Sequence, residues 1–321
     1  MSGGPELLRT RPRLPDRARL RDLAAANGAF VALVMLLVVA AATAPRFFDP
    51  TNLENTLRRA AILGFLAVGQ MLVLYMRGID LSVGAMVGVT AVSVTLNDDP
   101  VVGLVQALGV AVVVGSVNAW LITRRQVPPF VATFGMLVLL EGLRLMWTRG
   151  SASASAPPSF VEFARGSVLG IPTPVLAWVV LTAVVAVVIT RTPGGRRLVL
   201  AGSSDRMARL SGISPGRYVF VAFLLSAVLA VVAGVFLTGH SGYVDRSIGA
   251  GSELDSITAA LLGGARFKGG EGSFVGAAAG ALLLSSLGTL IIVLGLPPAL
   301  QDIAVGLLLL AALTLALRRR A

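Results

Sequence analysis

Long uncharged stretches constrain this chain more than any other feature of its sequence. Residues 23–45, 218–243 and 272–301 contain no Asp, Glu, Lys or Arg. An apolar run of about 18 residues or more is typical of a helix that spans a bilayer. Charged residues make up only 13% of the 321 residues, against about a quarter in soluble domains. The sequence therefore predicts an all-α polytopic membrane protein.

Polar and turn residues divide the apolar sequence into ten predicted transmembrane helices. Their predicted ranges are 26–45, 60–76, 83–96, 101–123, 130–148, 174–190, 218–239, 254–265, 273–295 and 299–317. Residues 1–22 form an Arg-rich N-terminal tail, and residues 23–321 form one transmembrane domain. Ala42-Thr43-Ala44 resembles a signal cleavage site, but the apolar run before it exceeds the usual signal core of about 7–15 residues. We interpret it as a retained helix, with a cleaved signal as the alternative.

The distribution of basic residues predicts the orientation. With the N-terminus in the cytoplasm, 19 of the 27 Lys and Arg residues fall in inner segments and six in outer loops. Cytoplasmic loops of membrane proteins collect Lys and Arg, so both termini are expected inside. The same bias explains the net charge of +11 without a nucleic-acid partner. The chain has no Cys and one His, His240, so we expect no thiolate or shared-histidine metal site.

Two pairs of segments look alike in the two halves of the chain. "VPPFVATFGMLVLL" from Val127 resembles "LPPALQDIAVGLLLL" from Leu296, and "IDLSVGAMVG" from Ile79 resembles "LDSITAALLGG" from Leu254. In the predicted topology the two halves have opposite orientations. Predicted helices two to five would then repeat as helices seven to ten, an inverted repeat of the kind found in transporters.

Each of the two short predicted helices, 83–96 and 254–265, follows a charged segment that contains glycine. A helix of this length does not cross a bilayer core of about 30 Å, and irregular backbone at membrane depth needs protein or a water-filled cavity around it. An ionisable side chain at mid-helix costs about 3 kcal/mol, so it tends to mark a function. We predict that a translocation path is lined by residues of both segments, namely Gly78, Asp80, Ser82, Glu253 and Asp255. The alternative is an aqueous turn in which Arg77 pairs with Asp80.

The longest predicted inner loop, 191–217, contains one predicted short helix. Ser203 is placed to cap it and Gly212 to end it. At about 100° per residue, Met207, Ala208 and Leu210 share one side. Asp205, Arg206 and Arg209 share the other. A helix of two turns is unstable alone in water, so it needs a partner surface, either a protein or the lipid headgroups.

Four segments together resemble the permease subunit of ribose-type ABC sugar importers. They are "GIDLSVGAMVG", "VPPFVATFGMLVLLEGL", "GSSDRMARLSGI" and "GSELDSITAALLGGARFKGGEGSFVGAAAGALLL", and the resemblance runs from about residue 60 to 317. It implies a multi-pass protein of the bacterial plasma membrane, in contact with membrane lipid, that acts as a homodimer or heterodimer of permeases. The implied partners are a cytoplasmic ATPase and an extracytoplasmic sugar-binding protein. The resemblance favours ATPase docking for residues 203–212. Such permeases usually have a second Gly where Arg77 stands and an Asn before "ARLSGI", where this chain has "GSSDRM".

Nothing in the sequence predicts that the chain is itself an enzyme. It has no G-x-x-x-x-G-K-[ST] phosphate loop, because the Lys of "GGARFKGGEG" is followed by Gly. We interpret that segment as an inner turn, so ATP and Mg would be bound by the partner ATPase and this chain would hold no cofactor. The rival function is a secondary transporter or channel that uses an ion or proton gradient. It would employ Asp80, Glu141 or Asp255 as a coupling carboxylate.

The remaining polar residues of the predicted helices have structural interpretations. Glu141 and Arg144 lie three residues apart on one helix face, which favours an ion pair inside the bundle. Gln70 and Asn118 are expected to make interhelical hydrogen bonds, and the small residues of "GAAAGALLLSSLG" from Gly276 to allow close helix packing.

Overall fold

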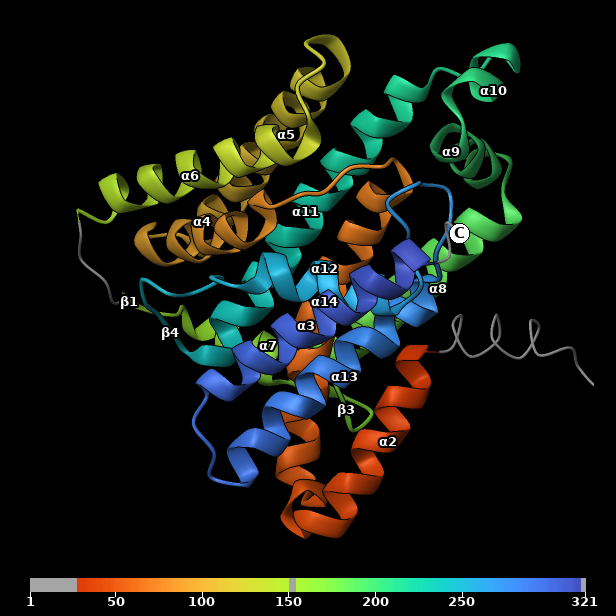
Figure 1. The fold of residues 1–321 in the computed structure, drawn as a ribbon. Helices are drawn as coiled ribbons and strands as arrows, with labels where there is room; N and C mark the ends of the chain where they lie inside the picture. Colours follow the sequence, from red (N-terminus) through yellow and green to blue (C-terminus); the bar gives the residue numbers. More distant parts are fainter. Residues whose placement is uncertain (1–27, 150–153, 319–321) are drawn as a thin grey trace, which may run out of the picture.

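The computed structural model describes residues 28–149 and 154–318, and within them helices dominate. The predicted tail 1–22 lies outside this range. The helices are α2 (Gly28–Thr43), α3 (Pro50–Tyr75), α4 (Ser82–Leu96), α5 (Pro100–Arg124), α6 (Pro129–Trp147), α7 (Pro158–Arg165), α8 (Thr173–Arg191), α9 (Pro193–Ser203), α10 (Asp205–Leu210), α11 (Pro215–Ser241), α12 (Ser252–Leu262), α13 (Phe274–Val293) and α14 (Ala299–Arg318), with a 3-10 turn η1 (Pro45–Phe48) (Figure 1). Two antiparallel strand pairs join β1 (Ala154–Ser155) to β4 (Tyr243–Val244) and β2 (Ser167–Val168) to β3 (Ile171–Pro172).

Six helices are long and apolar enough to cross a membrane, which confirms the all-α polytopic class. They are α3, α5, α6, α8, α11 and α13, and the shorter apolar helices include α2, α4 and residues 299–314 of α14. Each predicted transmembrane range coincides with a helix, and the short ranges 83–96 and 254–265 correspond to α4 and α12.

The largest boundary error concerns the second predicted helix. It was expected to begin at residue 60, but α3 begins at Pro50, after the N-cap Asp49. The charged residues Glu54 and Arg58 resemble loop sequence. Arg58 is nevertheless buried, because it pairs with Glu54 and donates to the carbonyls of Ala164 and Arg165 at the end of α7.

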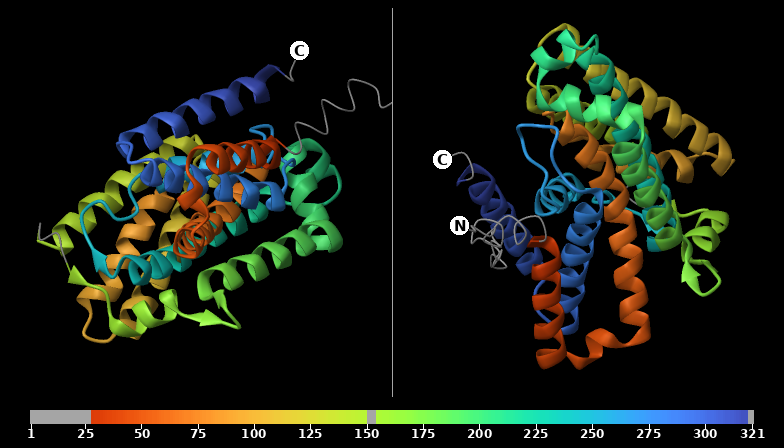
Figure 2. Two further views of the ribbon diagram at one scale, coloured as in Figure 1. Left: turned by 90° about the horizontal axis from the view of Figure 1, so that it is seen from below. Right: turned by 90° about the vertical axis from the view of Figure 1, so that its right-hand side faces the viewer.

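Helices α3 and α11 form the centre of the bundle and pack against each other. In the most apolar window of α3, 83% of the residues are buried, and in that of α11 61%, against 28% for α5, α6 and α8. The outer helices therefore contribute one face to the core and leave the other outside. Seen along the bundle, α14 and α8 lie at opposite edges with α2 and α13 between them (Figure 2).

The packing partners of the first and second halves of the chain correspond. Helix α3 packs against α13 and α12, as α11 packs against α5 and α4. Helix α4 contacts α5 and α6, as α12 contacts α13 and α14. Residues 50–147 and 215–318 thus make matching sets of contacts in the same chain order.

Small residues bring neighbouring helices into close contact. A methyl group at Gly276 would lie 2.6 Å from the carbonyl oxygen of Gly263, and one at Gly115 would lie 2.8 Å from the backbone of Leu224. The predicted close packing at Gly276 is therefore confirmed. Because lipid offers little hydrophobic force between helices, such contacts are a main source of their association.

Candidate functional site

The chain between α3 and α4 is broken by a short non-helical segment, Met76–Leu81. The next helix was predicted to begin at residue 83, but Ser82 already begins α4. Helix α3 ends because Gly78 donates its N–H back to the carbonyl of Val73, at 3.0 Å, and Arg77 adopts a φ of 61°. This left-handed conformation, which glycine adopts without strain, turns the chain out of the helix.

Asp80 occupies the middle of the break and is only 1% exposed. Its Oδ1 accepts hydrogen bonds from the Ser82 N–H (3.0 Å) and hydroxyl (2.5 Å), and its Oδ2 accepts one from the Ser226 hydroxyl of α11 (2.9 Å). A buried carboxylate is tolerated only when such bonds replace water. The alternative in which Arg77 pairs with Asp80 in an aqueous turn is wrong, since Arg77 forms its ion pair with Asp205 of α10.

Two amide side chains complete this arrangement, which we call the Asp80 cluster: Asp80, Ser82, Ser226, Asn118 and Gln70. Asn118 of α5 donates to the Ser82 hydroxyl at 3.2 Å. Gln70, oriented with its amide nitrogen toward the carbonyl of Asp80, bonds both backbone groups of that residue at 3.1 and 3.2 Å. The predicted interhelical hydrogen bond of Asn118 is thereby confirmed. Gln70 bonds the break instead of another helix, so the non-helical backbone of Asp80 is satisfied inside the bundle.

A second break lies between α11 and α12, over residues 242–251. Gly249 and Gly251 have φ values of 85° and 84° and turn the chain into α12. Glu253 bends back to accept the Gly251 N–H at 3.3 Å, and its carboxylate packs against Gly84 of α4. Glu253 and Asp255 are half-buried, and neither forms an ion pair with a side chain of residues 28–149 or 154–314.

Arg144 of α6 holds this second break in place from the neighbouring half of the chain. Its guanidinium donates to the carbonyls of Ile248 (3.0 Å) and Arg246 (2.7 Å) and pairs with Glu141 at 2.5 Å. The predicted Glu141–Arg144 ion pair is confirmed. Its partners Arg246 and Ile248 were not predicted, because they lie more than 100 residues away along the chain.

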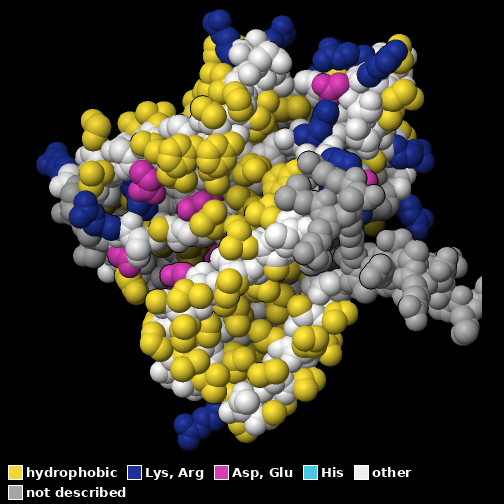
Figure 3. Space-filling view, viewed as in Figure 1, with side chains coloured by type: hydrophobic (Ala, Val, Ile, Leu, Met, Phe, Trp, Pro, Cys, Tyr) yellow, Lys and Arg dark blue, Asp and Glu magenta, His cyan; other side chains and the backbone are white. Residues whose placement is uncertain are grey.

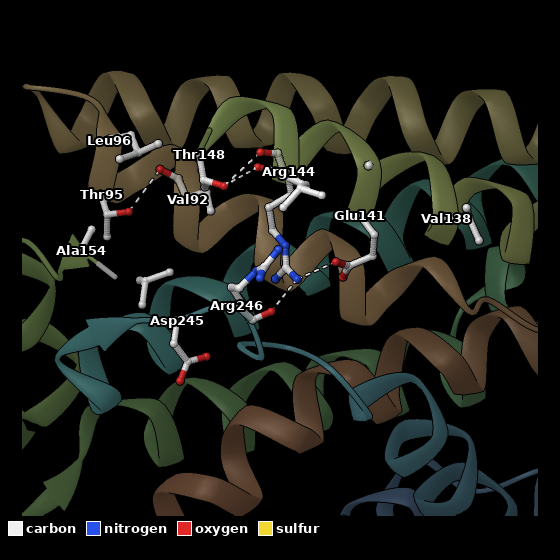
Figure 4. Close-up of a pocket in the computed structure, with 13 residues that line it drawn as sticks. Val92, Thr95, Leu96, Val138, Glu141, Arg144, Thr148, Ala154, Asp245 and Arg246 are labelled. Atoms are coloured by element: carbon white, nitrogen blue, oxygen red, sulfur yellow. Dashed lines mark hydrogen bonds and ion pairs between the residues drawn. The ribbon is translucent and has the colours of Figure 1, made fainter. Parts of the chain in front are cut away.

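A cavity of about 470 Å³ opens where Glu141 and Arg144 meet the second break (Figure 4). It is lined by apolar residues of α4 and α6 and by a group of polar side chains, namely Thr95, Glu141, Arg144, Thr148, Asp245 and Arg246. Figure 4 shows the Arg144 side chain between Glu141 and Arg246. A smaller cavity of about 150 Å³ includes Arg59, Asp255 and Gln301 in its lining. The second break thus borders a cavity lined in part by polar side chains.

The inner loop 191–217, in which one docking helix was predicted at 203–212, contains two helices, α9 and α10. Ser204, not Ser203, caps α10 by accepting the Met207 N–H at 3.3 Å. Gly212 follows α10 with a φ of 72°, as the sequence predicted for its end. Helix α9 was not predicted. It begins after Thr192, whose hydroxyl caps it by accepting the Gly195 N–H.

The exposed surface of α10 differs from the predicted one. Met207 and Leu210 are 55% and 76% exposed, but Ala208 is fully buried. Grouping Ala208 with the other two was wrong, because at about 100° per residue it lies about 160° from Leu210. Arg206 and Arg209 are exposed beside Met207 and Leu210, and Asp205 turns back toward α3.

Lys and Arg side chains gather around the end of the molecule that carries α9 and α10, at the upper right of Figure 3. Several Asp and Glu side chains appear at the left and middle of the same view, with Lys and Arg side chains beside them, and others lie at the upper right.

A bundle of apolar helices that contains a helix break with a buried carboxylate, and a second break beside a polar cavity, defines a polytopic membrane permease. The chain belongs to the family described as branched-chain amino acid transport system / permease component, which matches residues 52–313. The family is one of permease components rather than of enzymes.

Several relatives match nearly the whole chain. The ribose import permease protein RbsC of Bacillus subtilis (strain 168) is 32% identical over 294 residues, which cover 90% of this chain and 91% of that protein. The autoinducer 2 import system permease protein LsrC of Enterobacter sp. (strain 638) is 33% identical over 291 residues, 89% of this chain and 85% of that protein. RbsC of Escherichia coli (strain K12) is 31% identical over 290 residues, covering 88% and 90%. No solved structure matches the chain.

Proposed function

We propose that this chain is the membrane permease of an ATP-driven importer and forms the translocation path for a monosaccharide or a similar polyol. The observation that carries the proposal is the near full-length similarity to permeases named for the import of ribose and of autoinducer 2. The importer would include a cytoplasmic ATPase, an extracytoplasmic binding protein and a second permease subunit. ATP and Mg would bind to the ATPase.

The proposed topology has ten helices in the membrane and both termini in the cytoplasm. The basic residues gathered around α9 and α10 favour the cytoplasm for that end. The matching contacts of α3–α6 and α11–α14 support an inverted repeat in which α4 and α12 are the short, interrupted elements. Four of these ten helices, α2, α4, α12 and α14, are not among the six that are long and apolar enough to cross a membrane. They would cross it only in part or with the help of neighbouring protein.

The carboxylates of α6, α12 and α14 support a translocation path beside these three helices. Glu253 lies near Glu141, and Asp255 lies near both Glu253 and Asp302, so side chains of α6, α12 and α14 form an acidic row. A carboxylate that faced lipid would cost about 3 kcal/mol, so this face is expected to border water or protein. A second permease subunit on this face would enclose the path. Carboxylates there would accept charge-assisted hydrogen bonds from sugar hydroxyls.

The exposed side of α10 would dock on the ATPase. Met207 and Leu210 provide apolar contacts, and Arg206 and Arg209 provide charge around them. ATP-driven movement of the ATPase would displace α10 and change the exposure of the path from the outer to the inner side. Such a switch requires contacts that differ between the two states.

Reconstitution with co-purified partners tests the proposal. The permease, its ATPase and its binding protein are placed in proteoliposomes, and uptake of radiolabelled ribose and other monosaccharides is measured with and without ATP. We expect uptake that requires both ATP and the binding protein. Uptake driven by a pH gradient alone would refute the proposal in favour of a secondary transporter. Mass spectrometry of the purified complex identifies the partner subunits.

A further inference from the structure

Arg77 holds a backbone conformation that is costly for its residue type. Its φ of 61° lies in the left-handed region, which residues other than Gly, Asn and Asp seldom adopt. The conformation is fixed by two backbone bonds, from the Arg77 N–H to the carbonyl of Leu74 (2.9 Å) and from Gly78 to Val73 (3.0 Å). Strained residues of this kind persist where the surrounding structure requires them.

The side chain of Arg77 shows what the conformation achieves. Its Nη2 forms an ion pair with Oδ1 of Asp205, the first residue of α10. The two side chains are 38% and 47% exposed, so water screens the pair and its contribution to stability is small. The pair joins two segments 128 residues apart in sequence. The ion pair therefore connects the end of α3 to the start of α10.

The surrounding loops fasten the same end of α3. Gly270 donates its N–H to the carbonyl of Tyr75 at 3.0 Å, and the Tyr75 hydroxyl donates to the carbonyl of Gly272 at 2.7 Å. Gly202 of α9 packs directly on the Tyr75 carbonyl. The inner turn 263–273 and α9 thus contact the end of α3. The ion pair between Arg77 and Asp205 connects this end of α3 to α10 as well.

Only two residues, Gly78 and Ile79, separate Arg77 from the centre of the Asp80 cluster. A movement of α10 that pulls on Asp205 would therefore act on Arg77 and, through this short connection, on Asp80 and its bonds to α4 and α11. We propose that the Arg77–Asp205 ion pair transmits the displacement of α10 to the break between α3 and α4. Arg77 is a positioning residue, and the inference rests on the proposed function.

Uptake per ATP hydrolysed is the quantity that this ion pair controls. Arg77→Gly removes the charge and fits the left-handed backbone, so the protein is expected to assemble normally. We expect uptake per ATP to fall about five-fold or more, the lower end of typical coupling between sites. Asp205→Asn should show the same loss, and Arg77→Lys should retain most of the coupling. The double variant Arg77→Gly/Asp205→Asn should be no worse than either single variant.

Arg197→Ala is the matched control, because Arg197 is an exposed Arg of the adjacent helix α9 and lies outside the docking side of α10. It should leave uptake per ATP near the wild-type value. Exchange of the two charges, Arg77→Asp with Asp205→Arg, should restore part of the coupling. Additive losses in the double variant, an equal loss in Arg197→Ala, or normal coupling in Arg77→Gly would overturn the proposal. If Arg77→Gly fails to assemble, Arg77→Asn provides the same test, since Asn tolerates this φ.

A second measurement needs neither transport nor ATPase. The chain has no Cys, so Leu210→Cys on the exposed side of α10 takes a single nitroxide label in the purified permease. We expect Arg77→Gly and Asp205→Asn to increase the mobility of the label and Arg197→Ala to leave it unchanged. Unchanged mobility in all three variants would overturn the link. Failure of the wild-type importer to use ATP would instead refute the proposed function, and the label would still show whether Arg77 restrains α10.

Discussion

The two breaks in the bundle begin from similar sequence but have opposite environments. Before α4, Asp80 is 1% exposed and both of its carboxylate oxygens accept hydrogen bonds from this chain. In the first turn of α12, Glu253 and Asp255 are half-buried, and Asp255 borders a cavity. An acidic residue before a run of small residues therefore has two uses here. One organises the protein interior, and the other leaves charge available to water or solute.

The difference follows from the neighbours of each carboxylate. Three donors from Ser82 and Ser226 surround Asp80, whereas the acidic groups Glu253 and Asp302 lie near Asp255. Donors replace the water that burial removes, but a second carboxylate does not. The second break must therefore stay near water. The matching helix order of the two halves does not impose matching chemistry on their breaks.

The largest expected effect separates the breaks by stability. Asp80→Leu leaves the Ser82 N–H and two hydroxyls without an acceptor in the interior, a loss of about 3 kcal/mol or more in folding free energy. We expect little folded protein, a partial recovery in Asp80→Asn, and a normal yield for the matched variant Asp255→Leu. Fluorescence-detected size exclusion with thermal challenge measures this. Equal stability of Asp80→Leu and Asp255→Leu would remove the distinction between the two breaks.

A smaller loss of stability is expected when Arg144 of α6 no longer binds the second break. Arg144→Ala removes the bonds to the carbonyls of Ile248 and Arg246 and leaves Glu141 without its partner. We expect destabilisation of about 2 kcal/mol, with residues 242–251 more open to protease. Arg144→Lys should recover part of this, because Lys donates but lacks the planar fork of Arg. Limited proteolysis of purified protein compares the variants with Arg149→Ala as a surface control. Equal cleavage in Arg144→Ala and wild type would contradict this role.

Much of the fold was predictable, because it depends on local patterns. The apolar runs, the pair Glu141–Arg144 and the small residues near Gly276 act within one helix or between neighbours, and their interpretation is confirmed. The Asp80–Ser226 and Arg77–Asp205 contacts were not predictable, since they join residues 146 and 128 positions apart. Yet Arg77 and the segment containing Asp205 are the two places where the chain departs from the resemblance noted above. Departures that occur together in this way were the available signal for a contact.

Substrate passage, rather than folding, should depend on the second break. Asp255→Asn keeps the size of the side chain and removes its charge, so it weakens hydrogen bonds to sugar hydroxyls without opening the fold. We expect uptake by the reconstituted importer to fall about five-fold, or ~1 kcal/mol, at unchanged thermal stability. Asp245→Asn, on the wall of the larger cavity, serves as a control for a charge that lies farther from α12. Normal uptake in Asp255→Asn, or the same loss in Asp245→Asn, would argue against a path beside Asp255.

The smallest expected effect comes from replacing one Ser by Cys at the equivalent position after each break. Ser82 and Ser252 are the first residues of α4 and α12, and the chain contains no Cys, so each is replaced by the only thiol in its variant. Ser82 is 1% exposed, whereas Ser252 is partly exposed. A water-soluble maleimide should therefore modify Ser252→Cys at least about ten-fold faster, because modification of a fully buried thiol requires local opening.

The same pair of thiols decides whether the first break ever contacts the path. Ser82 lies beside Asp80 in the cluster, so its exposure requires the bonds from Ser82, Ser226 and Asn118 to separate. ATP, the ATPase and the loaded binding protein should supply the free energy for that opening if Gly78, Asp80 and Ser82 line the path during transport. The modification rate of Ser82→Cys would then rise with ATP turnover, and that of Ser252→Cys would change less. A Ser82→Cys thiol that stays unreactive during turnover would restrict the first break to a structural role and leave the path to α6, α12 and α14.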